Sequence, residues 1–320
     1  MRAIVINRCC KAEDLRVSDI PKPTAQPGWV VVKVFAAGMN HSEVILRLYE
    51  ADESYINTPV VPGIECVGEI EESLDAQFQK GDRVVALMGG MGRSFNGGDE
   101  EYALLPVSHV FKVNTDMDWL SLAAVPESYF TAYGSLTKAL LLKENDTLLV
   151  RGATSTIGQA AVQLGKASGA YVIGTSRKES AFEKIKALGA DECTIDDGEL
   201  STKQLQRKPN KLLELIGAKT LFDSLRTVTK PGIVCNTGNL GGEYVIRNFD
   251  PIKYVPSGVW LTGFHSNYPT QEDMDNIFSL IKNHHIKPQY NKVFTLNQIV
   301  EAHTLLEKGG AGGKIILKIR

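Results

Sequence analysis

The 320-residue sequence lacks the features that mark several classes of protein. No apolar run approaches the roughly 18 residues of a membrane-spanning helix, and the N-terminal segment turns polar too early for a secretory signal. The net charge is only −2, so no excess of basic residues indicates a surface for nucleic acid or anionic lipid. We therefore expect a globular protein that binds neither nucleic acid nor membranes.

Cysteine is also scarce, with five residues and no CxxC pair. An odd, scattered set is typical of reduced thiols in a cytoplasmic protein. Cys9 and Cys10 are adjacent, and they are either a redox pair or two incidental thiols. The sequence thus predicts a cytoplasmic location and no disulfide framework.

The period of the apolar residues changes twice along the chain. Residues 1–122 contain short Val- and Ile-rich runs cut by Pro and Gly, such as "GWVVVKVFAAG", which predict a β-rich segment. Residues 123–264 alternate strands with helices, as in a parallel sheet, and "KTLFDS" at 219–224 is interpreted as one of these strands. Residues 265–320 hold an amphipathic helix and a closing strand, "GGKIILKI". The length suits two domains.

The strongest chemical signal is a small-residue turn between a strand and a helix within residues 147–169. Such turns bind a pyrophosphate, because backbone N–H groups at the start of the helix face the anion. The match to G-x-G-x-x-G is imperfect, since Ala153 and Ser155 stand at the first two glycine positions. A plain strand–helix turn is the alternative, but the continuing strand–helix alternation favours a dinucleotide site. Its predicted phosphate-binding residues are Ser155, Thr156, Ile157 and Gly158.

The end of the next strand, "VIGTSRKE", indicates which dinucleotide is bound. Sites for NAD commonly place an acidic residue there to hold the ribose 2′-hydroxyl, and this strand end has none. Ser176, Arg177 and Lys178 instead offer a hydroxyl and two cations, which suit the 2′-phosphate of NADPH. The alternative is that they form a solvated start to the following helix. We predict NADPH as the cofactor.

Motifs spread over the whole chain resemble one known family. They are "GMNHSEV", "VPGIECVGEI", "KGDRVVAL", "GGDEEYALLP", "AAVPESYFTAYGSL", "GATSTIGQAAVQLGKASGA" and "GGKIILKI". In this order they are similar to the medium-chain dehydrogenase/reductase superfamily, in its zinc-free quinone oxidoreductase (zeta-crystallin-like) branch. The resemblance implies an α/β fold with a central Rossmann domain, a doubly wound parallel sheet, over residues 123–264. It also implies a β-rich GroES-like catalytic domain built from residues 1–122 and 265–320.

Zinc-dependent relatives carry ligands that this sequence lacks. Asn40 stands where they have a Cys, and Ile64 stands where they have a His. His41 and Glu65 remain, but two groups fall short of the three protein ligands of a catalytic zinc site. The four-cysteine structural lobe is missing as well, because residues 81–110 contain no Cys. We expect no metal, and we expect His41 to orient or pack.

Without zinc, the oxidation of an alcohol loses its main electrostatic aid. A quinone or an α,β-unsaturated carbonyl does not need that aid, because its developing charge spreads over a conjugated oxygen. The resemblance therefore implies hydride transfer from NADPH to a quinone or enone. The alternative is a non-catalytic NADPH-binding sensor or structural protein on the same fold. The sequence leaves the proton source and the physiological substrate open.

The resemblance also implies individual site residues. Asn40, Arg47 and Tyr49 match or neighbour the catalytic positions, although Arg47 could equally be a structural ion-pair partner. Bacterial relatives have a Tyr at the position of Ile45, and Tyr49 or Tyr55 could replace it. The implied cofactor-binding residues outside the turn are Asn40, Thr131, Gly238, Asn239, Gly263, Phe264 and Lys314.

The last strand of the Rossmann segment, "SGVWLTGF" at 257–264, predicts self-association. Val259, Trp260 and Leu261 would stand on an open sheet edge, which is an aggregation risk unless another chain covers it. In the resembling family this edge pairs with its copy across a two-fold axis. We therefore expect a homodimer through residues 257–264. The alternative is that Trp260 faces the core of its own subunit.

Overall fold

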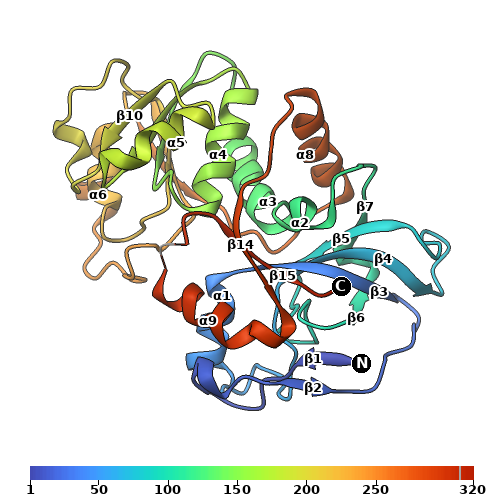
Figure 1. Ribbon diagram of the computed structural model, residues 1–320. Coiled ribbons are helices and arrows are strands. Elements are labelled where there is room, and N and C mark those ends of the chain that lie inside the picture. The colour runs from blue at the N-terminus through green and yellow to red at the C-terminus, as the bar shows by residue number, and fades with distance from the viewer. Residues whose placement is uncertain (310) are drawn as a thin grey trace. The chain divides into compact units, whose positions relative to one another are not determined.

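The computed structural model describes residues 1–309 and 311–320, which form two compact units. The terminal unit comprises residues 1–130, 267–282 and 287–320, and the central unit comprises 131–266 and 283–286. Both ends of the chain thus belong to the terminal unit (Figure 1). The first break between the units falls after Phe130, inside helix α3 (Pro126–Gly134). The start of α3 is tied to the terminal unit, because the Glu127 N–H donates to the Glu65 carboxylate.

The terminal unit is built on a seven-stranded sheet in the order β14-β15-β3-β4-β5-β7, with β6 also paired to β3. All pairs in it are antiparallel except β14 with β15. The C-terminal strand β15 lies beside β3, so the last residues of the chain complete a sheet begun by the first. The strands of this unit are β1 (Arg2–Ile4), β2 (Val17–Asp19), β3 (Trp29–Met39), β4 (Glu65–Ser73), β5 (Arg83–Leu87), β6 (Tyr102–Pro106), β7 (Val110–Lys112), β14 (Tyr290–Thr295) and β15 (Lys314–Lys318).

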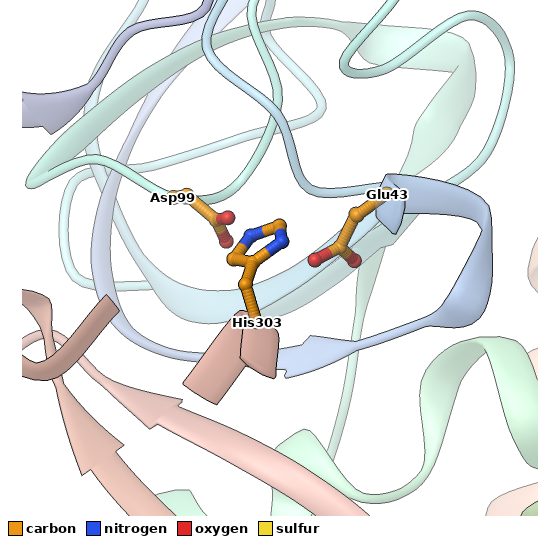
Figure 2. A group of neighbouring side chains, drawn as sticks. All are labelled: Glu43, Asp99 and His303. Atoms are coloured by element: carbon orange, nitrogen blue, oxygen red, sulfur yellow. The ribbon is translucent and has the colours of Figure 1, made fainter. Parts of the chain in front are cut away.

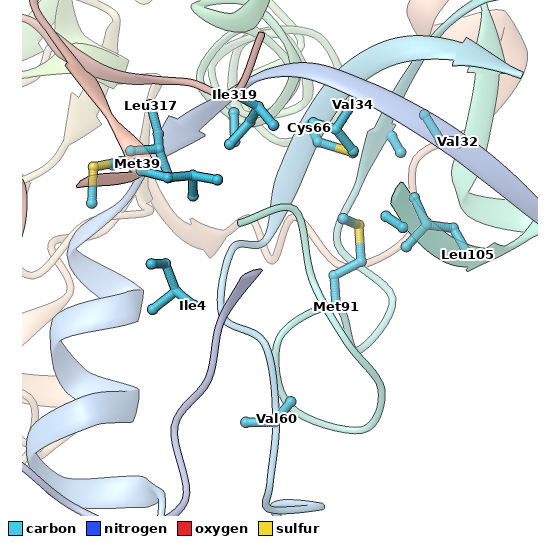
Figure 3. Packing of buried hydrophobic residues seen from close by; sticks show 14 of the residues in the cluster. Ile4, Val32, Val34, Met39, Val60, Cys66, Met91, Leu105, Leu317 and Ile319 are labelled. Carbon is cyan, nitrogen blue, oxygen red and sulfur yellow. The ribbon is translucent and has the colours of Figure 1, made fainter. Parts of the chain in front are cut away.

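The core of the terminal unit collects apolar side chains from strands that are far apart in sequence. Val32 and Val34 of β3, Cys66 of β4 and Leu317 of β15 gather with Ile4 in one cluster (Figure 3). All five are fully buried. Burying each Val, Leu or Ile side chain contributes about 1.5–3 kcal/mol, so this cluster helps to hold the two chain ends together.

Short helices complete the terminal unit. The helix predicted in "TQEDMDNIFSLIKNHHI" is confirmed as α8, and its apolar residues face inward at helical spacing. No helix among residues 1–309 and 311–320 has the length and hydropathy to cross a membrane. The helices and helical turns are η1 (Ala12–Asp14), α1 (His41–Ile45), η2 (Leu46–Glu50), η3 (Val107–His109), α2 (Trp119–Ala123), α8 (Gln271–Asn283), η7 (Leu296–Gln298) and α9 (Ile299–Lys308).

The central unit is a six-stranded parallel sheet in the order β10-β9-β8-β11-β12-β13. Strands β9 and β10 lie on one side of β8, and β11, β12 and β13 lie on the other. This is the doubly wound strand order of a Rossmann fold. The predicted fold class is therefore confirmed. The strands are β8 (Thr147–Arg151), β9 (Tyr171–Ser176), β10 (Glu192–Ile195), β11 (Lys211–Glu214), β12 (Gly232–Asn236) and β13 (Val259–Gly263).

One predicted strand of the central unit was wrong. Residues 219–224, "KTLFDS", lead into helix α6 (Leu221–Thr227), and the strand is β11, a few residues earlier. Leu221 and Leu225 are buried four residues apart, which is the spacing of a helix face. The other helical elements here are η4 (Ser135–Ala139), α4 (Thr156–Ala167), η5 (Glu179–Ala181), α5 (Phe182–Ala187), η6 (Leu200–Thr202) and α7 (Pro251–Tyr254).

Strand β13 is one of the two edge strands of the central sheet, as the sequence predicted. Val259 faces inward, whereas the Trp260 side chain is 56% exposed. The alternative in which Trp260 packs into the core of its own subunit is therefore wrong. The edge leaves a large aromatic residue beside solvent in the single chain.

Candidate functional site

The turn after β8 is closed by its own side chains. Gly152 takes a left-handed conformation with φ +90°, and Ser155 caps helix α4. The Ser155 hydroxyl accepts the Gly158 N–H at 3.1 Å and donates to the Gly152 carbonyl at 2.8 Å. Because that hydroxyl proton is used inside the turn, backbone N–H groups at the start of α4 are the donors left for a phosphate.

Gly158 lets helix α4 approach the turn closely. A Cβ at this position would lie 2.3 Å from the Gly152 carbonyl oxygen and 2.8 Å from Ala153 Cα. No side chain fits without moving the backbone. Close packing of this kind is the role of the last glycine in the dinucleotide motif, so the turn keeps the geometry although two glycines are replaced.

The end of β9 lies against this turn. The Thr175 hydroxyl accepts the Gly152 N–H at 3.1 Å, and the buried Ser176 hydroxyl accepts the Lys178 N–H at 3.1 Å. Arg177 and Lys178 are exposed, and neither forms an ion pair with any residue that the structure describes. The structure thus brings the predicted phosphate turn and the two predicted cations to the same edge of the central sheet.

The loops after β12 and β13 begin at the same end of the central sheet as the turn after β8, because the carboxyl ends of parallel strands lie together. Gly238 follows β12, and a Cβ there would lie 2.4 Å from the Leu215 carbonyl oxygen, so this loop packs tightly against the one after β11. Asn239, the next residue, is exposed. These positions agree with a cofactor-binding edge, although their role stays a prediction.

The remaining predicted cofactor residues of the central unit lie around η4. The Ser135 hydroxyl contacts the Thr237 hydroxyl at 2.9 Å and donates to the carbonyl of Thr131 at 2.7 Å. Phe264, just after Gly263 of β13, lies over Gly134, where a Cβ would be 2.0 Å from the ring. Thr131, β12 and β13 are therefore neighbours in this unit.

A buried polar network lies in the terminal unit around Glu65, which is 0% exposed. Glu65 Oε1 accepts from the Asn40 amide at 2.8 Å and from the Lys314 ammonium. Lys314 also donates to Asn40 Oδ1 at 2.7 Å and to the Ser128 hydroxyl at 3.2 Å. We call these residues the Asn40–Glu65–Lys314 network. It joins β3, β4 and β15, and it gives Lys314 a partner set that the sequence did not predict.

The network bears directly on the question of zinc. Asn40 donates its amide N–H groups to Glu65 and to the Gly38 carbonyl, and its oxygen faces an ammonium. Ile64, at the other ligand position, is a buried alkyl side chain with no lone pair. An ammonium already neutralises Glu65. These donors do not fit a catalytic zinc ion, which needs about three basic ligands around one point.

The other predicted catalytic residues lie outside this network. Arg47 is fully buried, and its guanidinium donates to the Cys10 carbonyl at 2.7 Å and to Glu307 at 2.5 Å. Those are the contacts of the structural ion pair that the sequence left open. Tyr49 and Tyr55 are 70% and 59% exposed and take part in none of the network's hydrogen bonds. His41 is exposed, so of the two expected roles the packing one is excluded and the orienting one stays a prediction.

Sequence reasoning missed a second buried cluster in the terminal unit, formed by Glu43, Asp99 and His303 (Figure 2). All three are at most 1% exposed. Burial raises the pKa of Glu43 well above its usual value and raises that of Asp99 to about 7. Burial, aided by the charge of Arg47, lowers the pKa of His303 to about 3. Glu43 and Asp99 lie in two separate motifs and His303 lies in neither, so no sequence signal joined the three.

It also missed the role of the residue just before the phosphate turn. Arg151 is fully buried and binds both carboxylate oxygens of Asp196, at 2.8 and 2.7 Å. It also donates to Asp223 at 2.9 Å, with Glu214 at 3.9 Å. This cation therefore ties the ends of β8, β10 and β11 to helix α6.

Comparison with known proteins agrees with both units. Residues 26–115 match the family described as alcohol dehydrogenase GroES-like domain, and residues 188–317 match the family described as zinc-binding dehydrogenase. The quinone oxidoreductase of Homo sapiens is 28% identical over 330 residues, which cover 99% of this chain and 97% of that protein.

Two solved structures show the same fold over the full chain. The quinone oxidoreductase from Coxiella burnetii has a TM-score of 0.86 and 22% identity, covering 100% of this chain and 99% of that one. The yhdH oxidoreductase from Salmonella enterica, solved in complex with NADP, has a TM-score of 0.81 and 20% identity, covering 100% of both chains. At these identities the likeness shows the fold alone.

Proposed function

The chain belongs to the medium-chain dehydrogenase/reductase superfamily, in its quinone oxidoreductase branch, and on this premise we propose that it transfers a hydride from NADPH to a quinone or an α,β-unsaturated carbonyl. One observation carries the choice of substrate class. The positions that would hold a catalytic zinc contain Asn40, with its amide fully engaged, and the alkyl side chain of Ile64. A substrate that accepts hydride without a Lewis acid fits such a chain.

The chemistry follows from the charge on the acceptor. Hydride addition to a conjugated carbonyl places negative charge on an oxygen that ordinary hydrogen bonds stabilise. The bound nicotinamide supplies the hydride. The chain's own part is to bind the pyrophosphate at the turn from Gly152 to Gly158 and the 2′-phosphate at Arg177 and Lys178. The roles of Asn40, Arg47 and Tyr49 toward the reacting groups stay predictions.

The test is steady-state oxidation of NADPH with a panel of quinones and enals, and a saturated alcohol with NADP⁺ as the comparison. We expect turnover with the conjugated acceptors and none with the alcohol. Tight NADPH binding with no turnover on any acceptor would contradict the proposal and favour a sensor or structural protein. Faster alcohol oxidation than quinone reduction would contradict the zinc-free mechanism.

Cofactor preference gives a sharper prediction. We expect NADPH to bind at least about tenfold more tightly than NADH, a difference of about 1.4 kcal/mol that one charge-assisted contact can supply. Arg177→Ala should remove most of this preference, because it deletes a cation that has no other partner. Lys186→Ala is the control, since this exposed lysine lies on α5 beside Glu183. Equal dissociation constants for NADPH and NADH in the wild type would refute the assignment.

Assembly gives another prediction. We propose that the protein is a homodimer through the β13 edge, residues 257–264, because a second copy would pair the open ladder and cover Trp260. Light scattering should give twice the chain mass at micromolar concentration. Trp260→Lys should shift the protein toward monomer, while Leu74→Lys, at another exposed apolar side chain, should not. A monomeric wild type would reject this interface.

We propose a cytoplasmic location for the protein. All five cysteines are unpaired, as expected in a reducing compartment. Cys66 and Cys235 are buried, and burial raises the pKa of both thiols, which keeps them protonated and unreactive. Fractionation of cells that produce the protein would test the location.

A further inference from the structure

The buried cluster of Glu43, Asp99 and His303 leaves its polar atoms without partners. One ligand atom from each residue lies within 4.8 Å of the other two, and the imidazole ring of His303 lies between the two carboxyl groups (Figure 2). Glu43 Oε2, both Asp99 oxygens and both His303 nitrogens have no hydrogen-bond partner. Each buried polar atom left in this state costs about 1–3 kcal/mol, and a species bound among the three side chains would remove that cost.

We propose that this cluster is a buried divalent-metal site and that zinc is the ion it fits. Two carboxylates and one imidazole form a donor set that zinc accepts. Calcium and magnesium prefer six or more oxygen ligands, so the imidazole of His303 argues against them. The charges also balance, because a divalent cation offsets Glu43 and Asp99 while His303 binds in its neutral form.

The nearby cations are paired elsewhere. The charge of Lys314 acts on Glu43, but its ammonium is paired with Glu65. Among the residues that the structure describes, no Lys or Arg forms an ion pair with Glu43 or Asp99. Arg47 is near enough to His303 to act on its charge state, but its guanidinium is paired with Glu307. A water molecule could occupy the same space, yet a buried water makes at most about four hydrogen bonds, and five atoms of the cluster lack a partner.

The geometry allows three-point coordination. Zinc ligands at about 2.1 Å from the ion lie about 3.4 Å apart in a tetrahedral arrangement. The ligand atoms lie within 4.8 Å of one another, so they would approach by at most about 1.4 Å. The three side chains form no hydrogen bonds to one another that would oppose this movement. Gly63 makes room for Asp99, because a Cβ at this left-handed position would lie 2.8 Å from Asp99 Oδ1.

The site differs from the positions that zinc-dependent relatives use. Glu43 accepts the backbone N–H of Asn40 through Oε1 at 2.9 Å, which leaves Oε2 for the metal. A metal here would therefore hold α1 and α9 together and fix the backbone of Asn40, as a structural ion does. Asn40 and Ile64 exclude a metal only at the catalytic position, and the expectation of a metal-free chain does not hold if zinc binds at this cluster.

Zinc titration of the full chain tests the proposal. Metal would be removed with a chelator, and zinc chloride would then be added in competition with a chromophoric chelator. We expect one zinc per chain, with Glu43→Gln, Asp99→Asn and His303→Gln each weakening binding by at least about 100-fold. Glu100→Gln is the control, because this neighbouring carboxyl is buried but lies outside the cluster, and it should bind zinc as the wild type does.

Two further readouts keep the test independent of how well the variants fold. Zinc should raise the thermal midpoint of the wild type and not that of His303→Gln. Cobalt(II) added to the metal-free wild type should show the visible bands of a low-symmetry site with oxygen and nitrogen ligands. Substoichiometric binding by the folded wild type, or equal loss in Glu100→Gln and His303→Gln, would overturn the proposal. Neither result touches the proposed function, whose tests measure NADPH binding and turnover.

Discussion

Replacing Arg151 by Met is expected to destabilise the central unit by about 3–5 kcal/mol. The guanidinium is fully buried and binds Asp196 at two points, with Asp223 on its other side. Removing it leaves these carboxylates in the interior without their cation, and Glu214 beside them. The loss includes both the hydrogen bonds and the cost of unpaired buried charge, so it exceeds that of an ordinary core substitution.

Chemical denaturation followed by hydrogen exchange would measure this loss, because exchange reports on peptides of the central unit separately from the terminal one. Arg151→Lys should fall between wild type and Arg151→Met, since a lysine keeps the charge but cannot bind Asp196 at two points. The control is Lys203→Met, whose ion pair with Asp197 is solvent-exposed and should leave the stability nearly unchanged. An Arg151→Met protein as stable as this control would show that the network does not hold the sheet.

The second large effect is expected from Lys314→Met in the terminal unit. Lys314 is 2% exposed, and its ammonium is the cation that faces the buried carboxylate of Glu65. Without it, Glu65 keeps only neutral donors, the Asn40 amide and the Glu127 N–H. Breaking a buried ion pair on one side costs about 3–5 kcal/mol, and we expect a loss of this size in unfolding free energy.

A double variant separates the ion pair from simple packing. Lys314→Met combined with Glu65→Gln removes both charges and should recover much of the stability that Lys314→Met loses alone. Lys22→Met serves as the control, because its pair with Glu71 is partly exposed and should contribute at most about 1 kcal/mol. Additive losses in the double variant would mean that the two side chains do not interact through charge.

Local sequence patterns determined the architecture of this protein well. The sequence predicted the strand, turn and helix from β8 to α4, because the apolar residues of the strand and helix and the small residues of the turn are contiguous in the chain. The edge position of β13 followed from its place at the end of the alternating region. Even so, β11 was misplaced, since a short strand buried on both faces has no alternation to distinguish it from the start of α6.

Polar partners in the interior were decided by tertiary structure alone. Lys314 meets Asn40 across 274 positions of sequence, and Glu43, Asp99 and His303 come from three separate segments. Resemblance suggested that Asn40, Arg47 and Lys314 matter, but it did not show that Arg47 is held by Cys10 and Glu307. The physical reason is that a buried charge is stable only with its partner in place, and only the packing of β3, β4, β15 and α9 determines which partner that is.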